Sequence, residues 1–278
     1  MRSAAARVRM AIAQRQGIHR VLEPIKTPSE DSAPARREGG ESRADQVVAY
    51  LRDHIAAHRL RPGSRLPSES VIGASLGISR PIVREAMRTL AATGLIEMAV
   101  GKRATVSPLD GATLRNVIEN AVLIGQADVG HVMEMRRGIE IAMVAVAAER
   151  CTPETAAALE AIVAEMAGKL DDVVAYTTLD MRLHLTLAEA ADNPLYLMLV
   201  EAFRQIFQTS MMIGIERWAE TPELNRVQQL HEEIVAAVVA GDPAAASTAM
   251  AQHFDNAIRV MFATTAQAPG GDGPTSGA

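Results

Sequence analysis

The sequence has little cysteine, few aromatic residues and no long apolar run, and each shortage excludes a class of protein. Its 278 residues include one cysteine, Cys151, so no disulfide can form within the chain, and a reducing compartment such as the cytoplasm is expected. No stretch approaches the run of about 18 apolar residues that spans a membrane, so we predict no membrane partner. Aromatic residues make up 3% of a chain that is 48% hydrophobic, which favours aliphatic and methionine cores.

Motifs of the common enzyme classes are also missing. The chain has no Walker loop, no dinucleotide-binding glycine motif and no nucleophile elbow. HEEIV, which begins at His231, lacks the second histidine of the metalloprotease motif, and Glu232 and Glu233 are turned about 100° and 200° away from His231 on a helix. We therefore predict that the protein is not an enzyme. The alternatives are a metal-dependent hydrolase or oxygenase fused to a DNA-binding module, and a DNA-architectural protein with a structural metal.

Charge is distributed unevenly along the chain. The formal net charge is -5, but residues 1–42 carry +3, residues 43–107 carry +5 and residues 108–278 carry -13. A basic segment joined to a strongly acidic one predicts that the first binds a polyanion and that the second has another task. Solvated surfaces produce such charge blocks as well, so the asymmetry alone does not identify DNA.

Both ends of the chain have the composition of disordered segments. Residues 1–42 begin with an arginine-rich stretch and continue through KTPSEDSAPARREGGES, which is rich in proline, serine, glutamate and glycine. We predict a disordered basic extension and linker over residues 1–42. The sequence AQAPGGDGPTSGA predicts a disordered tail over residues 266–278.

Residues 43–108 have the order of a winged helix-turn-helix. A first helix is expected over 44–59, a second ends at Gly77, and a third begins after Ser79 as its cap. The stretch LIEMAVGKRATVS then predicts two short strands that turn around Gly101. In a winged helix-turn-helix the third helix lies in the major groove of DNA and the wing contacts its backbone.

The acidic part is predicted to be entirely helical. Gly241 should end a helix, because glycine readily adopts a positive φ. Three pairs place a capping side chain before a proline, which indicates helix starts near 153, 222 and 243: Thr152-Pro153, Thr221-Pro222 and Asp242-Pro243. Further helices are expected over about 110–125, 130–150, 171–191 and 195–216. The predicted fold is therefore mainly α, with an N-terminal winged helix-turn-helix and a C-terminal all-α antiparallel helical bundle.

The start of the third helix carries the chemistry for binding DNA. Ser79, Arg80 and Arg84 gather at its N-terminal end, where free backbone N–H groups and the helix dipole also favour phosphate. A guanidinium there can bind guanine O6 and N7 bidentately, or a phosphate. We predict DNA contacts for Arg80 and Arg84, whereas Arg88 is expected to lie on the solvated outer face.

The run PGSRLPSE, followed by LGISRPIVREAMRTLAATGLIE and a glycine-tipped wing, resembles the DNA-binding domain of GntR-superfamily transcription regulators. The resemblance implies an inverted-repeat operator in double-stranded DNA. It places DNA-contacting positions at Ser79, Arg80, Ile82, Arg84 and Gly101. Members often carry arginine directly after the PSE triplet, where this chain has Ser70. We expect Arg65, Lys102 or Arg103 to make the DNA-backbone contact that the missing arginine would otherwise supply.

The stretch LDMRLHLTLAEAADNP sets Asp180 and His184 four residues apart within a helical pattern. Four residues return to the same helix face, so the pair could share a metal ion, or could form a hydrogen-bonded pair in a solvated groove. His231 and His253 lie at helical spacing among apolar residues in the last two expected helices. One carboxylate and three imidazoles from three helices suit zinc, nickel, manganese or iron.

The same residues resemble the FCD ligand-binding domain of the FadR subfamily. EMRRGIEIAMVAVAAER is similar to the first long helix of that domain. Its metal-binding helices are similar to the expected helices that contain Asp180, His184, His231 and His253. The resemblance implies one divalent metal per chain, most simply zinc, a small carboxylate effector contacted by Arg136, and a homodimer that acts as a repressor. A salt bridge from Arg136 to Glu140 is an alternative that can coexist with this role. We predict a linker helix over 109–128 and the metal- and effector-binding domain over 129–265.

Overall fold

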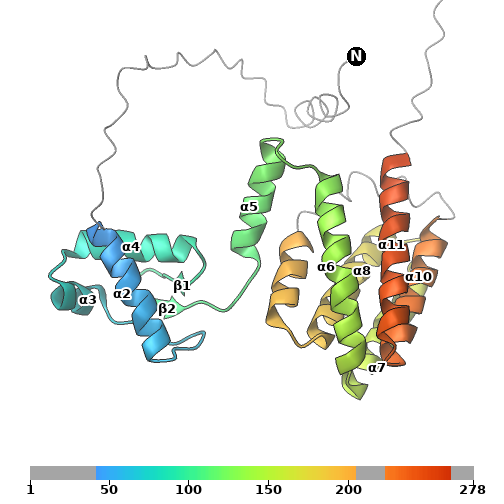
Figure 1. Ribbon diagram of the computed structural model, residues 1–278, viewed down its shortest axis with the longest axis horizontal. Coiled ribbons are helices and arrows are strands. Elements are labelled where there is room, and N and C mark those ends of the chain that lie inside the picture. Colours follow the sequence, from blue (N-terminus) through green and yellow to red (C-terminus); the bar gives the residue numbers. More distant parts are fainter. Residues whose placement is uncertain (1–41, 205–222, 264–278) are drawn as a thin grey trace, which may run out of the picture. The chain divides into compact units, whose positions relative to one another are not determined.

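The computed structural model describes residues 42–204 and 223–263. The predicted extension, up to residue 41, and the predicted tail lie outside these ranges, as do Thr221-Pro222 and the part of the expected helix that follows residue 204. In the described ranges the chain is mainly helical, with a two-stranded sheet, which confirms the predicted fold class (Figure 1). None of the helices in these ranges combines the length and the apolar character needed to cross a bilayer.

Three helices form the helix-turn-helix, and their ends follow local signals. Helix α2 (Arg43–Ala57) begins with a capping box between Ser42 and Asp45. Helix α3 (Glu69–Leu76) is capped by Ser68 and ends at Gly77, whose φ of 64° is left-handed, as predicted. Helix α4 (Arg80–Ala92) is the predicted third helix, with Ser79 at its N-cap position.

Helix α4 is amphipathic, and its apolar face holds it in the domain. The buried residues on this face recur at helical spacing and pack with the core of α2 and α3: Val83, Ala86, Met87 and Leu90. Val47 and Leu51 of α2 belong to the same core and are fully buried. The opposite face, which carries Arg80 and Arg84, is exposed. Packing therefore fixes which side of α4 is available to a ligand.

The wing is a short hairpin with an additional neighbour. Strand β1 (Ile96–Glu97) pairs antiparallel with β2 (Thr105–Val106), and Gly101 lies between them with a φ of 73°. Arg65 forms a β-bridge with Thr105, so the segment before α3 lies along the wing. The sequence predicted the hairpin but not this third segment.

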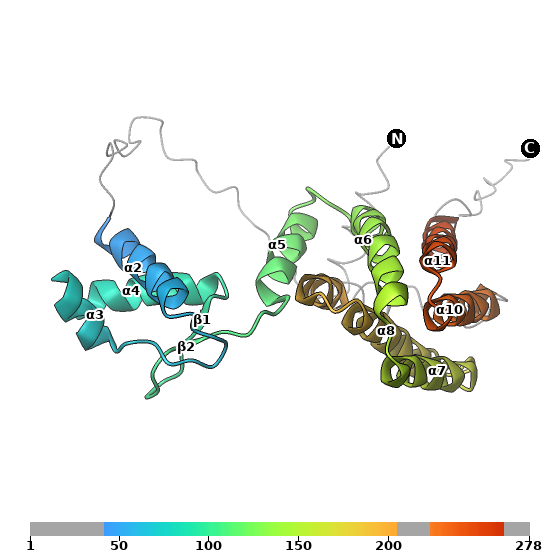
Figure 2. The ribbon, with the colours of Figure 1, turned by 60° about the horizontal axis from the view of Figure 1, so that its bottom comes forward.

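The acidic part is a helical bundle preceded by helix α5 (Ala112–Leu123), which has no buried residue. The bundle contains α6 (Val129–Arg150), α7 (Pro153–Ala167), α8 (Val173–Ala190), a helix over 194–204, α10 (Glu223–Val239) and α11 (Pro243–Ala263). Helix α6 packs on α8, α10 and α11, while α7 packs on α8 and α10 and α10 packs on α11 (Figures 1 and 2). The helices that carry histidines therefore surround one centre.

The predicted starts of two bundle helices are confirmed. Helix α7 begins at Pro153 after Thr152, whose hydroxyl accepts a hydrogen bond from the amide of Thr155, and α11 begins at Pro243. Gly241 has a φ of 68° between α10 and α11, as a helix-ending glycine should. Helix α8 starts two residues later than expected because Asp172 is its N-cap and accepts from the amide of Ala175.

Candidate functional site

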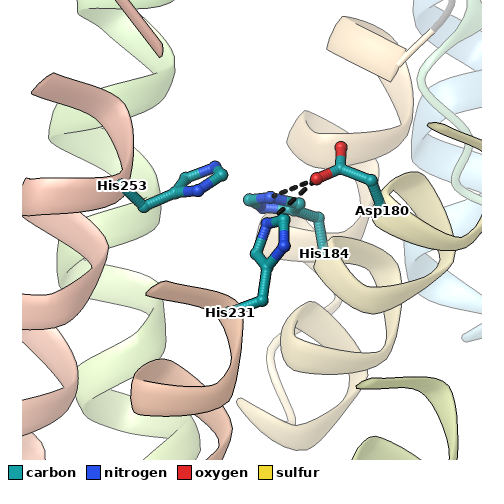
Figure 3. A group of neighbouring side chains, drawn as sticks. All are labelled: Asp180, His184, His231 and His253. Atoms are coloured by element: carbon teal, nitrogen blue, oxygen red, sulfur yellow. Dashed lines mark ion pairs between the residues drawn. The ribbon is translucent and has the colours of Figure 1, made fainter. Parts of the chain in front are cut away.

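Four potential metal ligands converge in the centre of the bundle (Figure 3). Asp180 and His184 lie one turn apart on α8, His231 comes from α10 and His253 from α11. All four are buried, and one ligand atom from each lies within 4.8 Å of the others. The structure thus brings together the four residues that the sequence singled out.

Two fully buried ring nitrogens of this cluster have no hydrogen-bond partner among the described residues. Nε2 of His231 lies 3.0 Å from Oδ1 of Asp180 without a hydrogen bond between them, and Nδ1 of His253 is buried and also unpartnered. Nε2 of His184 is 4.0 Å from the same carboxylate oxygen. Buried polar atoms nearly always have partners. Atoms that converge without bonding one another have the arrangement of ligands around a common cation.

Tyr176 and Gln228 determine which nitrogen of His231 carries the proton. The amide nitrogen of Gln228 donates to the carbonyl of Val163 and to Glu232, so its oxygen faces Tyr176. The Tyr176 hydroxyl must donate to that oxygen at 3.1 Å, and it therefore accepts from Nδ1 of His231, also at 3.1 Å. With its proton on Nδ1, His231 presents the lone pair of Nε2 to Asp180, as a metal ligand must.

Replacement of Tyr176 by phenylalanine should weaken metal binding by about 10- to 100-fold, because it removes the acceptor that holds the His231 proton on Nδ1. Affinity for zinc is measured by competition with a chromophoric chelator. Tyr196→Phe is the matched control, since it removes a hydroxyl from the same bundle. Equal zinc affinities for the Tyr176→Phe protein and the wild type would contradict this role.

Glu140 of α6 holds His184, the second histidine of the cluster. Its Oε1 accepts from Nε of Arg136 at 2.8 Å, and its Oε2 accepts a short hydrogen bond from Nδ1 of His184. The proton of His184 therefore lies on Nδ1, and Nε2 faces Asp180. The predicted Arg136–Glu140 salt bridge is present, but the sequence did not reveal the bond from Glu140 to His184.

The electrostatics of the cluster keep both carboxylates charged. Burial alone would raise the pKa of Glu140, but Arg136 and His184 outweigh it and lower that pKa to about 2. Burial would likewise raise the pKa of Asp180, and contact with His231, followed by the charges of the neighbouring histidines, lowers it when these rings are protonated. Burial lowers the pKa of His253 well below its usual value, so this imidazole is neutral near pH 7. Two carboxylates and a neutral imidazole are suited to bind a cation.

A pocket opens beside the four ligands. It is lined by Asp180 and His184 together with two arginines, Arg136 of α6 and Arg204 of the helix over 194–204. The guanidinium of Arg136 also lies 5.3 Å from the centre of the Phe254 ring, which helps to fix it. The residue predicted to contact an effector therefore lines a space next to the candidate metal ligands.

The residues predicted to contact DNA lie on one exposed side of the helix-turn-helix. Ser79, Arg80 and Arg84 are exposed, and Ile82 is half-buried against the core. Ser79 is at the N-cap position but its side chain makes no capping hydrogen bond, so the predicted cap is wrong in this detail. The hydroxyl is instead available to a ligand.

Two contacts near α4 were not expected. Nε of Arg84 donates to Oε1 of Glu69 at 3.1 Å, so Glu69 orients this arginine. The hydroxyls of Ser68 and Ser70 share a 2.9 Å hydrogen bond in which either can be the donor. The wing residues predicted to bind backbone are exposed: Arg65, Gly101, Lys102 and Arg103.

Some participating residues could have been found from their spacing. Tyr176 lies four residues before Asp180 on α8, and Gln228 lies three residues before His231 on α10, so each shares a helix face with a ligand. Arg204 has no such signal, because its place at the pocket depends on how its helix packs.

Models of two protein families match the chain, "Bacterial regulatory proteins, gntR family" over residues 43–106 and "FCD domain" over residues 131–256. The HTH-type transcriptional regulator LutR of Bacillus subtilis is 29% identical over 204 residues, which are 73% of this chain and 93% of LutR. The HTH-type transcriptional repressor NanR of Salmonella newport is 29% identical over 217 residues, 77% of this chain and 83% of NanR. Streptococcus agalactiae GntR has the same fold, with a TM-score of 0.58 and 21% identity over 78% of this chain and 99% of that one.

Proposed function

The chain belongs to the gntR family of bacterial regulatory proteins and is a transcription regulator with an FCD domain, not an enzyme, and we propose that it is a metabolite-responsive repressor of the FadR subfamily. Similarity to a protein named as a repressor supports the direction of control. A protein that acts on chromosomal DNA in a bacterium works in the cytoplasm.

We propose that Asp180, His184, His231 and His253 hold one divalent metal ion per chain. The observation that carries this proposal is the convergence of one ligand atom from each residue to within 4.8 Å, together with a buried, unpartnered nitrogen on His231 and on His253. Zinc is the ion that this mixed imidazole and carboxylate set suits best, although nickel, manganese and iron accept the same donors. A bound ion with open coordination positions would supply a Lewis acid for a carboxylate.

Protein purified without chelator or affinity tag should contain about one divalent metal ion per chain, as measured by elemental analysis. Dialysis against a strong chelator should remove this ion, and one equivalent of zinc should restore it. A metal content at background level before chelation, with no uptake of zinc, nickel, manganese or iron afterwards, would disprove the metal proposal.

We propose that the effector is a small carboxylate and that Arg136 contacts it. Arg136 lines the pocket beside the ligands, and its bond to Glu140 fixes the guanidinium in place. Glu140 also bonds His184, so an anion at Arg136 acts on the same network that orients a ligand. An effector shifts DNA binding only by the difference in its affinity for two states, typically 1–3 kcal/mol of coupling, or roughly 5- to 150-fold.

We propose that the regulator binds an inverted-repeat operator as a homodimer. One recognition helix reads few base pairs, whereas a two-fold dimer presents two such helices to two half-sites. The exposed face of α4, with Ser79, Arg80 and Arg84, supplies the base and phosphate contacts. Arg65 lies beside the wing, where it can replace the backbone contact that Ser70 cannot make.

The wing should contribute affinity without sequence preference. Lys102→Ala or Arg103→Ala is expected to weaken binding to operator and to random DNA alike, and to reduce the slope of log affinity against log salt by about one unit. Binding is measured by fluorescence anisotropy over a series of salt concentrations. Lys169→Ala, an exposed charge in the bundle, is the control. A changed sequence preference with an unchanged salt slope would place these side chains on bases.

A further inference from the structure

The pocket beside the candidate metal ligands is lined by two arginines rather than the single one that the sequence indicated. Arg136 enters from α6, and Arg204 enters from the helix over 194–204. Val200, one turn before Arg204, lines the same pocket, so this face of the helix is directed into it. The cavity itself is small, about 10 Å³, which is room for about one water molecule, so it must widen when a larger ligand binds.

Arg204 also has an unsatisfied hydrogen-bond donor. Its Nε is buried and has no hydrogen-bond partner among the described residues. Arginine cannot lose its charge in a protein, and a buried charged donor without an acceptor costs free energy. An anionic ligand in the pocket is the kind of partner that such a guanidinium requires.

The charges around the pocket indicate how many negative charges the ligand brings. Arg136 is paired with Glu140, and the charge of Arg204 is formally balanced by Asp180. The proposed divalent ion then leaves two positive charges without compensation. A monocarboxylate would neutralise one of them and a dianion would neutralise both, and in a partly buried site this difference is large.

We propose that Arg204 is a second anion-binding residue and that the effector carries two separate anionic groups. One is the carboxylate already proposed beside Arg136, and the other is a carboxylate or a phosphate bound by Arg204. Met181 and Val200 also line the pocket, so a short aliphatic link between the two groups suits it. This inference rests on the proposed metal and carboxylate site.

The test compares three probes of similar size on zinc-loaded protein by isothermal titration calorimetry. Butyrate has one carboxylate, succinate has two, and 3-phosphoglycerate has a carboxylate and a phosphate. Wild-type protein should prefer one or both of the probes with two anionic groups to butyrate by roughly 10- to 100-fold, the range for a hydrogen bond to a charged group. Arg204→Gln should reduce that preference to within about threefold, with butyrate binding and zinc affinity unchanged. Arg182→Gln, which changes an exposed arginine on α8, is the matched control.

Each outcome decides one of the two proposals. The preferred one of the two probes with two anionic groups identifies carboxylate or phosphate as the group at Arg204. Equal binding of butyrate and both of these probes, or a preference for them that survives Arg204→Gln, overturns the second anion site and leaves the first intact. Failure of the zinc-loaded protein to bind any of the three probes overturns the proposed carboxylate site and this inference together.

Discussion

The His231→Ala protein is expected to lose its metal and its response to carboxylates while it retains its affinity for operator DNA. Loss of an outer-shell partner commonly weakens metal binding 10- to 100-fold, so loss of a ligand should weaken it by more than about 100-fold. His231 is completely buried and its Nε2 is 3.0 Å from Asp180, so no other side chain replaces it. Zinc affinity, and operator binding with and without succinate, are the measurements.

Two further variants separate this effect from a general loss of structure. His131→Ala removes an exposed histidine of the same domain, at the start of α6, and should leave metal binding unchanged. His231→Gln keeps most of the side-chain volume, and its circular dichroism should match the wild type while its metal is lost. A His231→Ala protein that binds zinc and responds to succinate as the wild type does would remove His231 from the site.

Loss of Arg84 or Arg80 should have the opposite pattern, with weak DNA binding and an intact metal site. Each alanine variant is expected to cost about 1–3 kcal/mol of operator binding, or roughly 5- to 150-fold in Kd, if its guanidinium contacts a base. Arg84 is already oriented by its 3.1 Å bond to Glu69, so little side-chain freedom is lost when it binds. Anisotropy titrations with a selected operator and with random DNA measure the change.

Arg88→Ala is the matched control for these variants. Arg88 lies one turn after Arg84 on the same helix, is exposed, and pairs with Glu85 at 3.6 Å. Its removal should change operator affinity by less than about twofold, since exposed ion pairs contribute little. If Arg84→Ala and Arg88→Ala weaken DNA binding by the same factor, and do so for operator and random DNA alike, α4 does not read bases through Arg84.

Local signals made the helix boundaries predictable from the sequence. A proline directly after a capping residue such as Thr152 or Asp242 favours the first turn of a helix, and Gly77 and Gly241 end helices because their positive φ is strained for other residues. Ser79 shows that local sequence signals predict the position of a cap but not its hydrogen bond. Its position as N-cap was correct, but the direction of its hydroxyl depends on the exposed surroundings of α4 and not on the neighbouring sequence.

The candidate site was only partly predictable for the same physical reason. Asp180 and His184 share a helix face, so their proximity follows from the geometry of one helix. The bond from Glu140 to His184 joins residues 44 apart in sequence, and the bond from Tyr176 to His231 joins residues 55 apart. Such pairs depend on how α6, α8 and α10 pack, which spacing along the chain does not reveal.

If the four residues hold a metal ion as proposed, their origin on three different helices also ties the folding stability of the bundle to the supply of metal. In an unfolded chain Asp180, His231 and His253 are far apart, so the complete site exists only in the folded state. A ligand that binds only the folded state adds RT ln(1 + [L]/Kd) to the free energy of unfolding, about 2.7 kcal/mol at 100 times Kd. In cells short of metal, a larger share of the regulator is then unfolded and open to proteases. Under the proposed function, the amount of regulator, and not only its affinity for DNA, is then expected to follow the metal status of the cell.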